Sequence, residues 1–271
     1  MGCRVLWLCL LSCGLACSQV DLPTAIPQTH FSTGQDVVPV YEGWLRNADG
    51  TFTFVFGYFN RNWKEELVIP AGPDNKLEPG EVDRGQPTYF LPRRQPWVFR
   101  VQVPSDWGQK ELVWTITSHG RTEKAYAQLR LEEEIIERVI QSHGNLSRGE
   151  DDPNKPPFVK IAPVGSVRPN TPVTLTAFVT DDGLPKPKPE PVPRPGTQTN
   201  SVVRPKAGLS VSWMEYRGPA KVTFDSEGAI AVVSGQSMTT AHFAAPGTYI
   251  LRAMASDGAL STTADATVVV H

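Results

Sequence analysis

Cysteine is missing from most of this chain. All four cysteines lie within the first seventeen residues, and none follows Cys17. A disulfide framework or a thiolate metal site is therefore not expected in the folded part. The sequence also lacks a run of about 20 apolar residues, which a membrane-spanning helix needs. Its formal net charge of -2 shows no basic surplus of the kind that nucleic-acid binding requires, so no nucleic-acid partner is expected.

Motifs of catalysis are missing as well. The chain contains no GxSxG elbow, P-loop, GxGxxG or HExxH pattern, and its five histidines are scattered. Asp181-Asp182-Gly183 and Asp257-Gly258 offer clustered carboxylates of the type that calcium favours. However, Asp-Gly at the end of a strand is also ordinary turn chemistry. We therefore predict no catalytic residue, no metal site, no cofactor and no enzymatic activity.

The first eighteen residues have the layout of an export signal. Arg4 precedes an apolar stretch, Val5–Leu11, and small residues follow. Three processing patterns fit: a lipobox that ends at Cys13, a lipobox that ends at Cys17, and ordinary cleavage after Ser18. We favour lipidation of Cys17, with Cys13 as the alternative acceptor. The chain is thus expected to be exported to the cell envelope, with membrane contact only through this lipid.

Short alternating segments predict an N-terminal β-sandwich over residues 36–131, after a polar tether at 19–35. In Thr51–Phe59 aromatic side chains alternate along one face, and Asp49-Gly50 before it is a hairpin turn signal. Strands separated by turn residues are typical of a sandwich. Further strands are expected at Trp97–Val103, Glu111–Thr117 and Ala125–Leu131, with the Pro/Gly-rich stretch between Pro70 and Pro96 mostly loop.

The pattern changes period at residues 132–157. Ile135, Ile136, Val139 and Ile140 fall at helical spacing. This favours a short amphipathic helix or a charged extension of the last strand, followed by an interdomain linker.

Strand signals return over residues 158–271 and carry a family resemblance. The ordered segments Val173–Gly183, Leu209–Trp213, Gly218-Pro219, Phe243–Arg252 and Ala255–Gly258 resemble PKD-like domains, an immunoglobulin-like family of bacterial surface proteins. The resemblance implies a β-sandwich in which Trp213 and Tyr249 match the core tryptophan and the tyrosine corner. A Pro-rich insertion at 184–207 departs from the family pattern. The N-terminal half resembles uncharacterised secreted bacterial proteins, which implies no function.

These observations predict an all-β chain of two immunoglobulin-like β-sandwich domains in tandem. We expect a non-enzymatic binding, adhesion or scaffold module of the envelope whose partner is a protein or a polysaccharide. The alternative is a carbohydrate-binding module, because exposed aromatic rings stack on sugars. Its candidate ligand-binding residues are Trp63 and Trp107, since both have polar neighbours in the sequence.

Overall fold

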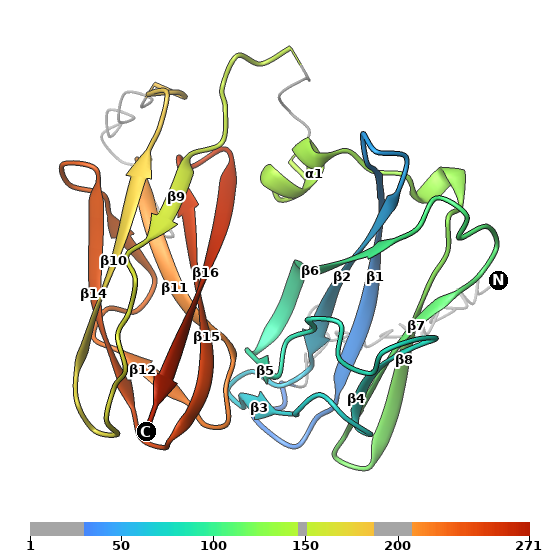
Figure 1. Ribbon diagram of the computed structural model, residues 1–271, viewed down its shortest axis with the longest axis horizontal. Coiled ribbons are helices and arrows are strands. Elements are labelled where there is room, and N and C mark those ends of the chain that lie inside the picture. The colour runs from blue at the N-terminus through green and yellow to red at the C-terminus, as the bar shows by residue number, and fades with distance from the viewer. Residues whose placement is uncertain (1–29, 146–150, 187–207) are drawn as a thin grey trace, which may run out of the picture. The chain divides into compact units, whose positions relative to one another are not determined.

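The computed structural model describes residues 30–145, 151–186 and 208–271 (Figure 1). The export signal, the tether up to residue 29 and most of the insertion at 184–207 lie outside these ranges. Lipidation of Cys17 or Cys13 therefore stays a prediction.

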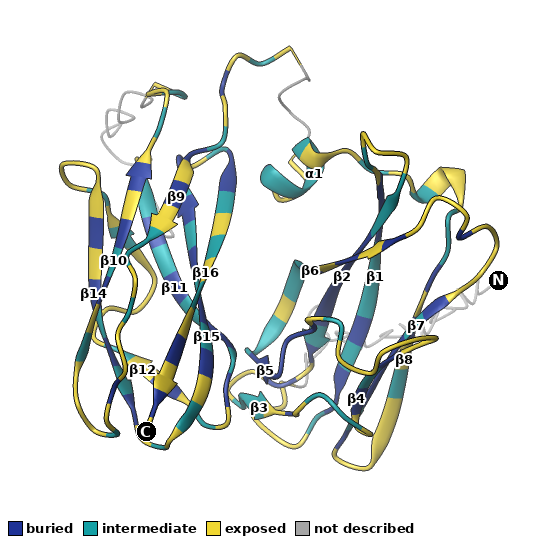
Figure 2. Cartoon of the chain, in the orientation of Figure 1, coloured by how far each residue is buried: buried dark blue, intermediate teal, exposed yellow. Residues whose placement is uncertain are grey.

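The N-terminal half is a β-sandwich built from three small sheets. One sheet has the order β1-β2-β6, the second has the order β4-β7-β8, and β3 pairs with β5. Their inner faces carry the buried residues (Figure 2). The strands are β1 (Val37–Arg46), β2 (Phe52–Asn60), β3 (Leu67–Val68), β4 (Asn75–Glu78), β5 (Tyr89–Phe90), β6 (Arg93–Val103), β7 (Leu112–Ser118) and β8 (Arg121–Ala127).

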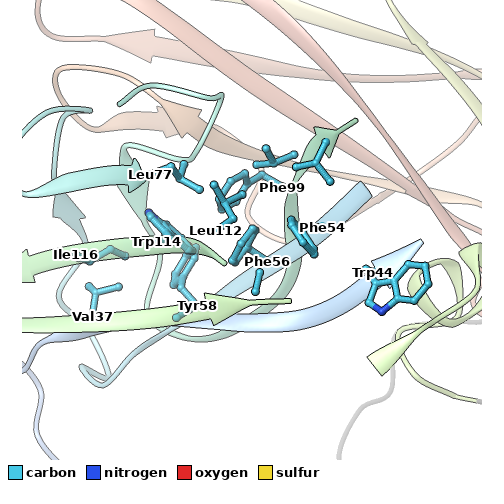
Figure 3. Close-up of a cluster of buried hydrophobic side chains, with 14 of the residues drawn as sticks. Val37, Trp44, Phe54, Phe56, Tyr58, Leu77, Phe99, Leu112, Trp114 and Ile116 are labelled. Carbon is cyan, nitrogen blue, oxygen red and sulfur yellow. The ribbon is translucent and has the colours of Figure 1, made fainter. Parts of the chain in front are cut away.

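The predicted hairpin forms between β1 and β2. Gly50 adopts a φ of 81°, which favours glycine, and Asn47 and Thr51 are joined by backbone hydrogen bonding. Phe54 and Phe56 of β2 then face inward and are fully buried. They pack in an aromatic cluster with Phe99 and Trp114 (Figure 3).

One expectation for the N-terminal half is wrong in detail. The last strand is predicted at Ala125–Leu131, whereas β8 spans Arg121–Ala127. After Ala127 the chain leaves the sheet and runs beside β1. There the Tyr41 hydroxyl donates to the Gln128 carbonyl at 2.7 Å. The stretch between Pro70 and Pro96 is mostly loop, as predicted, with short strand segments inside it. One of these segments is β4, which buries Asn75 and Leu77. Its mostly polar sequence gives no strand signal.

A short helix follows the first sandwich. The 3-10 turn η1 (Leu131–Glu133) precedes α1 (Glu137–Gln141). Of the two alternatives for this segment, the structure has the helix, although it is shorter than the apolar spacing suggested. None of the described helices is long and apolar enough to span a bilayer.

The C-terminal half is a two-layer β-sandwich of the immunoglobulin kind. One sheet has the order β12-β14-β10-β9 and the other has the order β13-β11-β15-β16. The strands are β9 (Phe158–Ile161), β10 (Val173–Thr180), β11 (Ser210–Arg217), β12 (Val222–Phe224), β13 (Ala229–Ala231), β14 (Gln236–Phe243), β15 (Gly247–Ser256) and β16 (Ser261–Val270).

The core of this second sandwich agrees with the alternation in the sequence. Leu175, Val211 and Leu251 come from both sheets and are fully buried. Trp213 is 9% exposed. The Tyr249 hydroxyl donates to the Ala245 carbonyl at 2.9 Å, which is the hydrogen bond of a tyrosine corner. The predicted roles of Trp213 and Tyr249 in the core are confirmed.

A β-bulge in β11 places one residue of the C-terminal half in contact with the N-terminal half. The register against β15 shifts between Glu215 and Arg217, so Tyr216 is the extra residue. Bulges re-aim side chains, and here Tyr216 is buried in the hydrophobic cluster of the N-terminal half. Residues Phe31–His271 form one compact unit, and the boundaries of two separate domains at 36–131 and 158–271 stay a prediction.

Candidate functional site

Trp63 lies at the surface, as expected. Its side chain is 46% exposed, and its backbone N–H donates to the Phe31 carbonyl at 2.9 Å. The Arg93 guanidinium lies 4.2 Å from the centre of the Trp63 ring and 4.9 Å from the Phe59 ring. A cation over an aromatic face is attracted by the ring's electrons, so Arg93 occupies one side of this platform.

Trp107 does not share that surface. It is only 7% exposed and belongs to the N-terminal core. Its ring packs edge-on against Phe54, with centroids 5.9 Å apart, and its indole N–H donates to the Lys110 carbonyl at 2.8 Å. The expectation that Trp107 is exposed is therefore wrong. Its polar neighbours form a turn that folds the ring inward, which a reading of adjacent residues misses.

Carboxylates gather at one end of the C-terminal sandwich. Asp181 and Asp182 follow β10, Asp257 lies in the turn between β15 and β16, and Asn154 lies just before β9. Figure 1 shows these three segments at the same end of the sandwich. We call Asn154, Asp181, Asp182 and Asp257 the strand-end cluster.

Most oxygens of this cluster accept hydrogen bonds from nearby backbone. Asp257 Oδ1 accepts from the Ala259 and Leu260 amides at 2.6 and 2.7 Å, and its Oδ2 accepts from Asn154 Nδ2 at 2.9 Å. Two buried oxygens have no hydrogen-bond partner in the described chain: Asn154 Oδ1 and Asp181 Oδ1. Asn154 itself is only 2% exposed. Such orphaned acceptors are costly unless a ligand satisfies them.

Asp181 is the member of the cluster whose electrostatics are most perturbed. Burial, followed by the negative charges of Asp257 and Asp182, raises the pKa of Asp181. Within the described residues, no group of three or more histidine, cysteine, aspartate or glutamate side chains is arranged to hold a metal. The three aspartates of the strand-end cluster are thus not grouped as a carboxylate site, and its unpartnered oxygens are those of Asn154 and Asp181. Carboxylate and amide oxygens are the ligands that Ca²⁺ prefers.

Three of the four members of this cluster, the aspartates, already stand out in the sequence. The sequence predicts ordinary turn chemistry for both Asp-Gly motifs, and the hydrogen bonds that Asp257 and Asp181 accept from their own turns agree with it. Asn154 was missed because it lies in a segment that looks like linker.

A set of polar contacts, which we call the seam, joins β11 and β15 to the N-terminal half. The Tyr216 hydroxyl donates to the Gly85 carbonyl. The Thr88 amide donates to the Tyr216 carbonyl at 3.3 Å, and the Gly218 amide donates to Thr88 Oγ1 at 3.2 Å. Arg217 pairs with Asp83 at 2.7 Å. Backbone and side chains of the bulge thus bind the segment before β5.

Arg252 is the most connected side chain of the seam. Its guanidinium forms a bidentate pair with Asp265 at 2.7 and 2.8 Å. It also donates to the Val98 carbonyl on the free edge of β6 and lies 3.8 Å from the centre of the Tyr216 ring. The planar, multiply donating group of arginine suits such a position, and lysine would not replace it.

A cavity with a mixed polar and apolar lining lies beside Arg252. It has a volume of about 780 Å³ and is lined by residues such as Trp97, Met214, Ile250 and Met254. The charged lining residues pair within the protein: Arg100 with Glu137, Arg217 with Asp83, and Arg252 with Asp265.

No family model matches the sequence, and no curated protein matches it. Among solved structures, the D00-D0 domain of intimin is 10% identical, with a TM-score of 0.30 over 87% of this chain and all of that one. Chimeric titin Z1Z2 is 12% identical, with a TM-score of 0.26 over 88% of this chain and 98% of that one. A conjugative transposon lipoprotein from Bacteroides eggerthii is 9% identical, with a TM-score of 0.28 over 42% of this chain and 96% of that one. The PKD-like resemblance of the C-terminal half stays a prediction.

Proposed function

We propose that this chain is an exported, non-enzymatic scaffold module of the cell envelope that presents two coupled β-sandwiches to a protein or polysaccharide partner. The seam is the observation that supports it. Flexible tandems are joined by a linker alone, whereas here backbone hydrogen bonds and the Arg252 contacts tie one sandwich to the other. A coupled tandem transmits position and force between its ends, which is the mechanical requirement of a scaffold.

Fractionation of a bacterial host that expresses the full chain tests the envelope role. We expect the mature protein in the envelope fraction, with a lipid on Cys17 detectable by intact mass. Cys17→Ser is expected to remove the lipid, and Cys13→Ser serves as the matched control. Cytosolic protein that retains its leader would refute the proposal, and loss of the lipid only in Cys13→Ser would move the acceptor to Cys13.

The carbohydrate alternative now depends on Trp63 alone. Co-sedimentation of the protein with insoluble cell-wall polysaccharide tests it. Retention that is lost on Trp63→Ala and kept on Trp107→Phe would favour the carbohydrate-binding module over the scaffold.

A second candidate function is calcium binding at the strand-end cluster. Two observations favour it: the orphaned oxygens of Asn154 and Asp181, and the charge repulsion among three aspartates. A divalent cation would satisfy both. The site lies where β9 begins, so a bound cation would also tie the segment that enters the C-terminal sandwich to the β15–β16 turn.

Calcium is therefore expected to raise the melting temperature of the protein. A ligand at about one hundred times its dissociation constant stabilises the folded state by about 2.7 kcal/mol, which corresponds to a rise of roughly 5–10 °C. Calorimetry in 10 mM CaCl₂ and in EDTA measures it. Asp181→Asn is expected to fold normally in EDTA and to lose most of the calcium response, while the exposed Asp106→Asn keeps it. Equal melting temperatures with and without calcium would exclude the site.

A further inference from the structure

A buried carboxyl group lies directly behind the seam. Glu215 of β11 is only 3% exposed. Its Oε2 accepts a hydrogen bond from the Val222 amide at 2.8 Å, and its Oε1 has no hydrogen-bond partner among the described residues. Burial of a charged carboxylate with one unsatisfied oxygen is costly, so this position favours the neutral acid.

The charged and titratable groups around Glu215 come from four neighbouring segments: Glu66 before β3, Tyr89 of β5, Lys221 before β12 and Tyr249 of β15. The Lys221 ammonium is 2.7 Å from Glu66 Oε2, and the Tyr89 hydroxyl donates to the same carboxylate. The lysine is thus engaged by Glu66. Burial, together with the negative charge of Glu66, raises the pKa of Glu215 to about 7, against the opposing effects of the Val222 amide and Lys221.

Gly218 connects this carboxyl group to the seam. A Cβ atom added at Gly218 would lie 2.2 Å from Glu215 Oε1 and 2.5 Å from the Tyr249 ring. The carboxyl oxygen therefore lies directly against the Gly218 backbone, at a position where a side chain would not fit. The amide of the same residue donates to Thr88 Oγ1 across the seam. A change of charge at Glu215 therefore acts on a backbone segment that binds the other sandwich.

We propose that Glu215 makes the seam responsive to pH: the neutral side chain keeps the contact between Gly218 and Thr88 closed, and its ionised form loosens it. Opening lets water reach the carboxylate, which relieves the cost of a buried charge that has no counter-ion of its own. The inference needs only the seam, and it holds whether or not the chain is an envelope scaffold.

The direction of the effect follows from proton linkage. In the closed seam Glu215 keeps its proton up to a pKa of about 7, whereas an open, solvated glutamate has the ordinary value of 4.5. Between these values the closed state binds more protons than the open state. Closure is therefore fully favoured below pH 4.5 and is progressively lost as pH rises toward about 7.

Hydrogen exchange of the Thr88 and Gly218 amides tests the proposal on the full mature chain. After correction for the intrinsic rate, their protection is expected to fall by up to roughly 30-fold between pH 5.5 and pH 8. Glu215→Gln, which cannot ionise and keeps an oxygen for the Val222 amide, is expected to give nearly the same protection at both values. Glu227→Gln, an exposed glutamate of the same half, is the matched control and should behave as the unmodified protein does.

Two results would overturn the proposal. One is equal protection of both amides at pH 5.5 and pH 8 in the unmodified protein, a measurement that does not depend on any variant folding. The other is a pH response in Glu215→Gln as large as that of the Glu227→Gln control.

Discussion

Replacement of Trp114 by alanine is expected to lower the free energy of unfolding of the N-terminal sandwich by about 4 kcal/mol. Removal of a buried aromatic side chain typically costs about 3–5 kcal/mol, because contacts are lost and a cavity remains. Trp114 is fully buried and contacts Phe99 at a centroid distance of 4.7 Å, with Phe56 and Phe90 also adjacent. A domain has only about 5–15 kcal/mol of net stability, so much of it depends on this residue.

The Trp114 indole also carries a buried hydrogen bond that a conservative variant isolates. Its N–H donates to Asn75 Oδ1 at 2.9 Å, and the Asn75 amide group donates to the Ile69 and Pro87 carbonyls at 2.9 and 2.8 Å. Trp114→Phe keeps an aromatic ring but leaves Asn75 Oδ1 without a donor, at a cost of about 1–3 kcal/mol. Urea unfolding followed by far-UV circular dichroism measures both variants. A loss below 1 kcal/mol for Trp114→Ala would contradict the packing described.

Arg252→Met is expected to destabilise the protein by about 2–4 kcal/mol and to separate the unfolding of the two sandwiches. Methionine keeps an apolar side chain but removes the cation over Tyr216, the pair with Asp265 and the donation to Val98. A hydrogen bond to a charged group contributes about 1.5–3 kcal/mol, and a cation over an aromatic ring adds about 0.5–2 kcal/mol. Asp265 is 40% exposed, which limits the cost of leaving it unpaired.

Calorimetry distinguishes this role from a general loss of stability. We expect one coupled transition in the unmodified protein and two resolved transitions in Arg252→Met. The matched control is Arg46→Met, which removes an arginine that is 55% exposed and paired with Glu134; surface pairs of this kind contribute at most about 1 kcal/mol. Two transitions already present in the unmodified protein would show that the seam does not couple the halves.

Alternation in the sequence predicted the all-β fold because its signal is local. Each of Phe54, Phe56, Leu175 and Leu251 is two residues from another inward side chain, and a period of two can be read without knowing the partner strand. The strand β4 was missed for the opposite reason. Its four residues are mostly polar and show no hydrophobic alternation, so the strand is defined only by its pairing with β7.

The seam could not be predicted because it depends on a single extra residue. Strict alternation from Val211 and Trp213 places Glu215 inward, as the structure has it, and Tyr216 outward toward solvent. The bulge at Tyr216 and the presence of a second sandwich turn that exposed position into a buried one. Likewise, Asn154 joins the strand-end cluster through a contact with Asp257, which lies 103 residues away.

Two arginines, Arg252 and Arg84, bind backbone carbonyls of the edge strand β6. Alternate residues of an antiparallel edge strand turn their backbone groups outward, and an open row of such groups is a template on which a foreign strand can add. Two of these carbonyls are already occupied: Val98 by Arg252, and Gln102 by Arg84 at 3.2 Å. The residue that couples the sandwiches therefore also blocks the start of an intermolecular ladder, so its loss would expose the chain to aggregation as well as to unfolding.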